Sequence, residues 1–187
     1  MNNTQLLGNR VPQDYFITKG AGESDITIHA GSFHLALKEA GIERANIMSY
    51  SSIMPGIARE IEQPMDYEHG EVMESILSAG NCRKGERISV GIIHGWLYHS
   101  QTQERIGGLV CERQGDYSTD ELHEQLHLSL QELYTNGFDD DYDLKDITIN
   151  TESIIPTKEY GTALVAICFV NHVYPQMEMQ VELSKAS

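Results

Sequence analysis

Apolar and polar residues alternate in several stretches of the chain, and these stretches predict β-strands. The alternation is clearest over residues 87–99 and 105–113, which a short polar segment separates, so we expect these two strands to form a hairpin. Residues 146–155 also alternate, and residues 161–173 form a nearly continuous apolar run, which is typical of a buried central strand. Shorter strands are expected at residues 14–18, 45–51 and 72–79.

Two other stretches have the period of amphipathic helices. Leucines recur on one face of residues 118–136, and Gly137 follows the end of this pattern. Residues 32–40 place apolar side chains at positions i, i+3, i+4 and i+7. Ser32 is expected to cap this shorter helix, which ends before Gly41. Strand pairs with intervening helices favour an α+β or α/β fold with layered sheets.

Three further expectations concern the organisation of the chain. The glycine-containing segment at residues 20–25 is expected to form a loop, and it lacks the lysine and the downstream spacing of a phosphate-binding loop. The segment after Pro175 is expected to be loosely ordered. The length of 187 residues is suited to one domain with its own core, so we expect residues 1–187 to form a single domain.

Charge and cysteine content narrow the classes of function. The formal net charge is −15, which argues against nucleic acid or an anionic membrane as a partner, because basic surfaces bind both. Three widely spaced cysteines form neither a disulfide framework nor a metal-type cluster, which favours a reducing compartment. The first residues have no signal-peptide pattern, and no apolar run is long enough to cross a membrane. We therefore expect a cytoplasmic protein.

Ser51 and Ser52 follow a predicted strand and precede Pro55 and Gly56, which prevent that strand from continuing unchanged. If the turn strains the peptide, Ser52 Oγ can attack the Ser51 carbonyl and convert the amide into an ester. Elimination then gives dehydroalanine, and hydrolysis gives a pyruvoyl group at a new chain terminus. Such a ketone condenses with amines and acts as an electron sink. Two hydroxyls in an ordinary turn are the simpler interpretation of this pair taken alone.

The serine pair lies in the first of two blocks with a specific pattern. The first block reads Phe33-x-x-Ala36-Leu37-x-x-Ala40-Gly41-Ile42-x-x-x-Asn46-x-x-x-x-Ser51-Ser52-Ile53-Met54-Pro55. The second, shorter block reads Gly108-Leu109-Val110-Cys111-Glu112. Together they resemble the pyruvoyl-dependent arginine decarboxylase family, in which the second block carries the catalytic glutamate. The resemblance extends from about Tyr15 to about Val173.

The resemblance implies a self-cleaved enzyme. Cleavage between Ser51 and Ser52 would give a small chain of residues 1–51 and a large chain of residues 52–187, with a covalently bound pyruvoyl cofactor derived from Ser52. The implied reaction is the decarboxylation of an amino acid through a Schiff base, with arginine to agmatine and carbon dioxide as the default. The implied fold is an α+β four-layer αββα sandwich, assembled as a homotrimer or a higher multiple.

Glu112 and Asn46 are the candidate catalytic partners of Ser52. Glu112 falls on a predicted strand among apolar neighbours, where partial desolvation would keep its carboxyl protonated and able to donate. The resemblance favours this role over that of a solvent-facing carboxylate. Asn46 matches the active-site asparagine of the family, and its amide could hydrogen-bond the Ser51 carbonyl or the substrate. A loop cap is the alternative role for Asn46.

One position departs from the family pattern and concerns the substrate. The family has an aspartate that pairs with the substrate guanidinium directly after the helix phenylalanine, but here Phe33 is followed by His34. Imidazole is a poor bidentate partner for guanidinium. We therefore consider Glu43 and Asp25 together with His34 as candidate substrate-binding residues, and the decarboxylation chemistry is more firmly implied than the substrate.

Two other functions compete with a decarboxylase. The segment His123-Glu124-Gln125-Leu126-His127 matches the His-Glu-x-x-His pattern of zinc hydrolases on a predicted helix. No third histidine pattern follows, and the neighbouring leucines are needed for core packing, so we expect no metal site. The second alternative is a non-catalytic or uncleaved trimer on the same scaffold that binds a small molecule.

Overall fold

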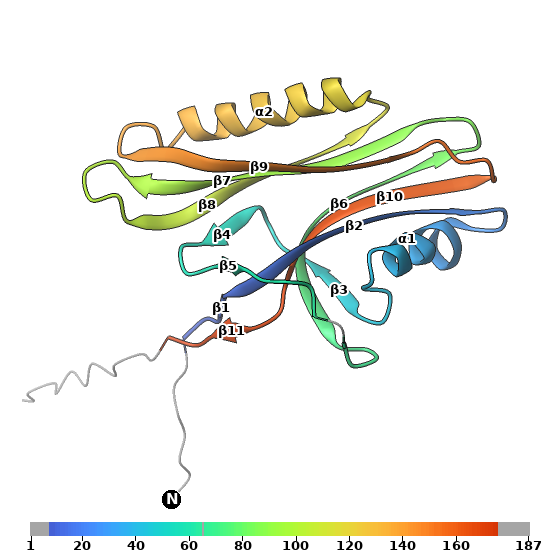
Figure 1. The fold of residues 1–187 in the computed structure, drawn as a ribbon, viewed down its shortest axis with the longest axis horizontal. Helices are drawn as coiled ribbons and strands as arrows, with labels where there is room; N and C mark the ends of the chain where they lie inside the picture. The colour runs from blue at the N-terminus through green and yellow to red at the C-terminus, as the bar shows by residue number, and fades with distance from the viewer. Residues whose placement is uncertain (1–7, 65, 176–187) are drawn as a thin grey trace, which may run out of the picture.

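The computed structural model describes residues 8–64 and 66–175, and its α+β class is the one expected from the sequence (Figure 1). Two β-sheets face each other, and a helix lies on the outer side of each. The loose order expected after Pro175 concerns residues outside the described part. The elements are β1 (Val11–Pro12), β2 (Asp14–Ser24), the π-helical turn η1 (Ile28–Phe33), α1 (His34–Glu39), β3 (Asn46–Ser49), β4 (Ile53–Pro55), β5 (Arg59–Glu60), β6 (Val72–Arg83), β7 (Ile88–His99), β8 (Arg105–Gly115), α2 (Thr119–Thr135), β9 (Tyr142–Ile154), β10 (Tyr160–Phe169) and β11 (His172–Val173).

The first sheet has five strands in the order β3-β6-β10-β2-β5. Its central strand β10 pairs antiparallel with both β2 and β6, and it is buried along almost its whole length. This confirms the buried central strand predicted from the apolar run. The apolar character arises because one face of β10 meets the other sheet while the other face meets α1.

The second sheet has four strands in the order β4-β8-β7-β9. The predicted hairpin is confirmed as β7 and β8, which pair antiparallel over most of their length. The predicted amphipathic helix is confirmed as α2, which covers the outer face of this sheet. Ser118 caps α2 in a reciprocal capping box with Glu121, so the helix begins at a fixed residue.

A substitution in the leucine stripe of α2 is expected to destabilise the protein strongly. Leu126 is fully buried in a cluster with Ile93 and Leu97 of β7. Leu126→Ala should lower the free energy of unfolding by about 2–5 kcal/mol, because it leaves a cavity against the sheet. Leu128→Ala is the matched control on the same helix, since its side chain is 57% exposed. It should change stability by less than about 0.5 kcal/mol in urea unfolding. Equal losses would contradict this packing.

The loop expected at residues 20–25 is wrong, because β2 continues through this segment to Ser24. The glycines have a packing role. A Cβ at Gly20 would lie 2.3 Å from the carbonyl oxygen of Ala36, and one at Gly22 would lie 2.4 Å from that of Ser32. Glycine therefore lets η1 and α1 lie directly against the strand.

The expected cap at Ser32 is also wrong. The helical run begins earlier, at Ile28 of η1, and Ser32 lies inside it. Its side chain is buried, and its Oγ is 2.8 Å from Oγ1 of Thr162 on β10. A polar contact to the sheet has therefore replaced the capping contact. The helix does end as expected, with Gly41 at a positive φ of +70°.

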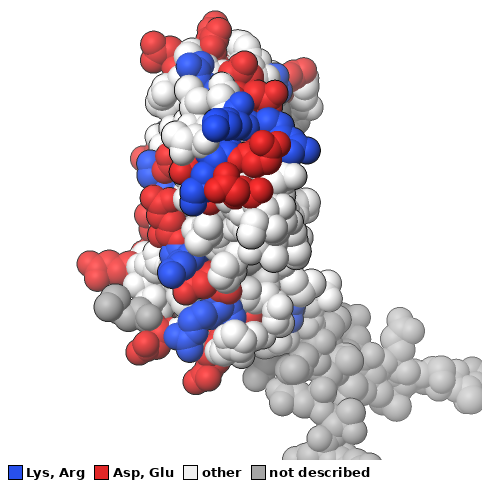
Figure 2. All heavy atoms as spheres, turned by 90° about the vertical axis from the view of Figure 1, so that its right-hand side faces the viewer, with Lys and Arg blue, Asp and Glu red and all other residues white. Residues whose placement is uncertain are grey.

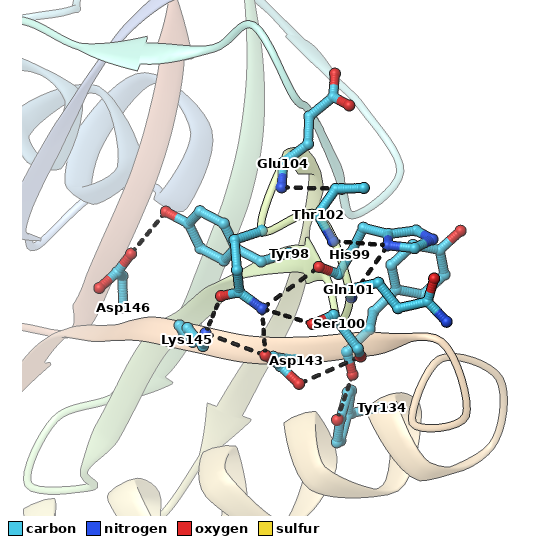
Figure 3. A network of polar contacts seen from close by, with 12 residues as sticks. Tyr98, His99, Ser100, Gln101, Thr102, Glu104, Tyr134, Asp143, Lys145 and Asp146 are labelled. Atoms are coloured by element: carbon cyan, nitrogen blue, oxygen red, sulfur yellow. Dashed lines mark hydrogen bonds and ion pairs between the residues drawn. The ribbon is translucent and has the colours of Figure 1, made fainter.

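The tip of the β7–β8 hairpin is fixed to β9 by a polar network (Figure 3). Gln103 holds its backbone at a positive φ of +59°. Its Nε2 donates to the Ser100 carbonyl at 2.9 Å and to Asp143 Oδ2 at 3.0 Å. Lys145 Nζ donates to Gln103 Oε1 at 2.5 Å. These contacts order the tip of the hairpin, and β8 starts directly after this tip.

Arg105 begins β8 directly after this tip and holds the segment that follows β4. Its Nε donates to the Gly56 carbonyl at 3.0 Å, and its Nη2 donates to the Ala58 carbonyl at 2.6 Å. Its guanidinium also lies over the Trp96 ring, 4.1 Å from the centroid. The hairpin thereby positions β4, which directly follows Ser52.

The surface bears charges of both signs. Figure 2 shows acidic and basic side chains interspersed on the face turned toward the viewer, without a continuous basic area. Exposed ion pairs such as Arg83–Glu159 at 3.0 Å are consistent with this mixture. In the described ranges, no helix combines the length and the apolar character needed to cross a bilayer.

Candidate active site

Ser51 and Ser52 lie where the chain passes from one sheet to the other. β3 ends at Ser49 in the five-stranded sheet, and β4 begins at Ile53 in the four-stranded sheet. On the first side, the Tyr50 amide donates to the Ser75 carbonyl at 2.8 Å. On the second side, the Val110 amide donates to the Ser52 carbonyl at 3.2 Å. The serine pair is therefore fixed at both ends by backbone hydrogen bonds to different sheets.

The peptide between the two serines is held in a tight turn. The Ile53 amide donates to the Ser51 carbonyl at 2.8 Å, which closes a three-residue turn centred on Ser52. This hydrogen bond polarises the carbonyl that a neighbouring nucleophile would attack. The same amide is placed to stabilise negative charge on that oxygen as it develops.

The Ser52 hydroxyl is in direct contact with Glu112. Ser52 Oγ lies 2.8 Å from Oε1 and 2.7 Å from Oε2 of Glu112, so the hydroxyl donates to the carboxylate. Both side chains are half-buried. Glu112 lies on β8 opposite Ile92, two residues beyond Val110, and these two apolar side chains belong to the core between the sheets. Glu112 therefore faces the inter-sheet side, where Ser52 crosses.

This contact gives a nucleophile and a base within hydrogen-bonding distance. Burial, with a contribution from the Glu112 charge, raises the pKa of the adjacent Cys111 thiol to about 11. Cys111 points to the α2 side of the strand and takes no part in the contact. A carboxylate in direct contact with the Ser52 hydroxyl can accept its proton and return it later.

Asn46 lies apart from this pair in the chain. It begins β3, at the opposite end of the strand from Ser51, and its side chain is exposed. Its Nδ2 donates to the Gly70 carbonyl at 2.8 Å. Within one chain, the described contacts of Asn46 are thus those of a residue that fixes a loop.

The three candidate substrate-binding residues also lie away from Ser52. His34 is exposed on the first turn of α1, on the outer side of the five-stranded sheet, where it lines an apolar pocket with Phe33. Glu43 lies in the turn between α1 and β3. Asp25 follows the end of β2, and its Oδ1 accepts the Glu159 amide at 3.3 Å. The fold of one chain does not bring these residues to the Ser52–Glu112 pair.

The residues of the zinc-hydrolase pattern lie on α2. The helix directs Leu122, Leu126 and Leu130 into the core, whereas Glu124 and His127 are exposed. No group of three or more His, Cys, Asp and Glu side chains in residues 8–64 and 66–175 is arranged to hold a metal ion. The pattern on this helix thus has no third ligand in the described structure.

A cluster of charged side chains near the serine pair could not be predicted from the sequence. Glu74 on β6 is buried, and it contacts Arg10 just before β1 and His172 on β11. These residues are far apart in the sequence, and Glu74 lies in a strand whose pattern gives no sign of a buried charge. Only the pairing of β6 with β10 and of β1 with β11 brings them together.

Comparison with known proteins relates this geometry to a family. A sequence model described as pyruvoyl-dependent arginine decarboxylase matches residues 14–174. The chain is 23% identical over 159 residues to the pyruvoyl-dependent arginine decarboxylase of Methanopyrus kandleri, covering 85% of this chain and 97% of that protein.

Two further relatives have similar names. The chain is 29% identical over 186 residues to pyruvoyl-dependent arginine decarboxylase AaxB of Chlamydia abortus, covering 88% of this chain and 93% of that protein. It is 28% identical over 123 residues to a probable pyruvoyl-dependent arginine decarboxylase of Chlorobaculum tepidum, covering 59% of this chain and 65% of that protein. Because the family model spans most of its length, the chain belongs to the pyruvoyl-dependent arginine decarboxylase family.

Proposed function

We propose that this protein is a pyruvoyl-dependent decarboxylase that converts arginine to agmatine and carbon dioxide. The observation that carries the proposal is the contact of Ser52 Oγ with both oxygens of Glu112. Family membership supplies the cofactor, a covalently bound pyruvoyl group made from serine. The residues present suit such a group, because Ser52 has a base in contact and a polarised carbonyl directly before it.

The first step of the proposal is self-cleavage between Ser51 and Ser52. Ser52 Oγ bonds to the Ser51 carbonyl carbon while its proton passes to Glu112. The carbon–nitrogen bond then breaks, and the nitrogen takes up a proton. Loss of the Ser52 Cα proton breaks the Cβ–O bond, which releases Ser51 as a carboxylate and leaves dehydroalanine. Water then replaces the nitrogen as ammonia, and no oxidant or reductant is needed.

Turnover uses the same residues in a second role. When present, the pyruvoyl group supplies an electrophilic ketone that withdraws electrons from the substrate α-carbon. Glu112 lies beside position 52 and is placed to protonate the α-carbon after carbon dioxide leaves. The apolar side chains of Ile92 and Val110, next to Glu112, belong to the core between the sheets. One carboxyl thus handles the proton in both maturation and turnover.

The higher-level organisation is part of the proposal. We propose one domain of residues 1–187, stacked as a four-layer αββα sandwich, and a cytoplasmic homotrimer or higher multiple. The two facing sheets with outer helices support the stacking. The separation of His34 from Ser52 by a sheet supports assembly, because a second copy could supply an outer-face residue to the site. The exposed apolar side chains Met48 and Ile53 beside the crossover support it as well.

Mass spectrometry of freshly purified protein tests the proposal directly. Under denaturing conditions we expect chains of residues 1–51 and 52–187, the larger one lighter by ammonia than its serine form. Under native conditions we expect the two chains to remain together. The small chain contains β2, which pairs with β10 from Tyr15 to Ser24. Loss of the small chain without denaturant would contradict this pairing.

Decarboxylation of arginine by the cleaved protein completes the test. A cleaved protein that releases carbon dioxide from a different amino acid would retain the chemistry and correct the substrate. A single full-length chain without activity would contradict the proposal and favour the uncleaved binding protein. Bound zinc at one equivalent would instead favour the hydrolase.

A further inference from the structure

The buried cluster around Glu74 has no role in the chemistry described above. Glu74 lies on β6 with its side chain 3% exposed. Arg10 Nη2 contacts one of its carboxylate oxygens, and His172 Nε2 contacts the other. Burial, together with the Arg10 charge, lowers the pKa of His172. A buried carboxylate is strongly destabilising unless it is well paired, so this one needs an explanation.

The pairing of Glu74 is incomplete. Within the described residues, neither carboxylate oxygen of Glu74 has a partner with hydrogen-bond geometry, although both are buried. The Arg10 side chain is 47% exposed, and its segment is anchored by the two-residue strand β1 and by the Gly8 amide, which donates to the Pro175 carbonyl at 3.2 Å. Glu74 therefore faces a guanidinium that is partly exposed and that comes from a segment outside the two large sheets.

Two phenol groups complete the surroundings of this guanidinium. Hydrogen bonds to the side chains of Tyr50 and Tyr174 raise the pKa of Arg10. A buried carboxylate with nearby hydroxyl acceptors is the set of groups that recognises a guanidinium, because every N–H of that ion is a donor. The cluster thus has the chemistry of a guanidinium-binding site in which the protein's own Arg10 lies.

The cluster adjoins the crossover. Phe169 stands opposite Glu74 in the sheet, and the Tyr50 ring packs on Phe169 with the centroids 5.6 Å apart. Met48 pairs with Glu74, and Ser52 follows Met48 by four residues, so at most about 14 Å of extended chain separates them. An arginine side chain and a glutamate side chain extended toward each other cover much of this distance. Figure 1 shows the β1–β11 ribbon at the end of the molecule where β4 lies.

We infer that Glu74, assisted by Tyr50, binds the guanidinium of the arginine substrate, and that Arg10 occupies this position in the absence of substrate. The inference rests on the proposed function and specifies its substrate subsite. In this arrangement Glu74 supplies the carboxylate that His34 cannot provide. Arginine must displace Arg10 to bind, so Arg10 acts as an internal competitor of the substrate.

Ligand binding to a protein that cannot form the pyruvoyl group tests this without any turnover. In a Ser52→Ala background, Arg10→Ala should bind agmatine about 10- to 100-fold more tightly than the background protein in calorimetry, because the competitor is gone. 1,4-Diaminobutane, which lacks the guanidinium, should show no such gain. Arg83→Ala, which removes an exposed arginine paired with Glu159, is the matched control and should leave agmatine affinity unchanged.

Adding Glu74→Gln to Arg10→Ala should abolish the gain, and Tyr50→Phe should reduce agmatine binding more mildly with less effect on folding. Unchanged or weaker agmatine binding in Arg10→Ala would overturn the inference, as would an equal gain for 1,4-diaminobutane. In the active protein, Arg10→Ala should lower KM for arginine and leave kcat unchanged. An Arg10- and Glu74-dependent affinity in a protein without decarboxylase activity would refute the proposed function and keep the binding site.

Discussion

Ser52→Ala is expected to leave one full-length chain that does not decarboxylate arginine. Alanine has no oxygen to attack the Ser51 carbonyl, so neither the ester nor the ketone can form. Without the electron sink, the rate should fall by about six orders of magnitude or more, which is below detection. Denaturing mass spectrometry and carbon dioxide release from labelled arginine measure the two parts of this result.

Ser51→Ala is the matched control for this prediction. The proposed cleavage uses the carbonyl of residue 51 and not its hydroxyl, and the Ser51 side chain is exposed. This variant should therefore be cleaved and active to within a few-fold. Cleavage of the Ser52→Ala protein at the same peptide would show that another nucleophile acts, and Ser52 would lose its proposed role.

Glu112→Gln is expected to slow both self-cleavage and turnover by about 10²- to 10⁴-fold, the usual contribution of a positioned acid or base. Glutamine keeps the size of the side chain and can still contact Ser52 Oγ, now 2.7–2.8 Å from the carboxylate oxygens, but it cannot take up the proton. Cleavage is measured as the fraction of split chain over days. Turnover is measured on the fraction that has been cleaved, so that the two effects are separated.

Glu124→Gln is the appropriate control for a lost carboxylate. Glu124 is exposed on α2, away from the inter-sheet core, and it is the glutamate of the zinc-hydrolase pattern. The substitution should leave cleavage and turnover unchanged. Normal rates in Glu112→Gln would remove Glu112 from the mechanism, whereas a loss in Glu124→Gln would bring the helix pattern back into consideration.

The elements that could be predicted from the sequence are those whose pattern is decided locally. The leucine stripe of α2 marks the face that meets the core, and β7 and β8 are strand-type segments separated by a short polar turn, so their type and approximate bounds were predicted correctly. The β2 segment with Gly20 and Gly22 was predicted wrongly, because glycine is normally a sign of a loop. There it serves the close approach of a helix, a reason that only the tertiary structure reveals.

The candidate site was predictable to a similar extent. Ser52 and Glu112 were found through the family blocks, but they are sixty residues apart, and only the crossover between the sheets brings them into contact. The cluster of Glu74, Arg10 and His172 gave no signal, because ion pairs between distant strands leave no period or motif in the sequence. Which charges meet in the core depends on how distant strands pair, and the local pattern of one strand does not show this pairing.

The position of the proposed cut between two sheets has a consequence for folding. Before cleavage, the crossover keeps β3 and β4 close together at all times, so the sheets assemble in a first-order process. After cleavage, β2 and β3 belong to one molecule and their partners β10 and β6 to another. Refolding of the mature protein therefore becomes second-order in concentration, and its apparent stability rises with protein concentration. The uncleaved chain would thus hold the two sheets together through a covalent link that the cleaved protein would lack.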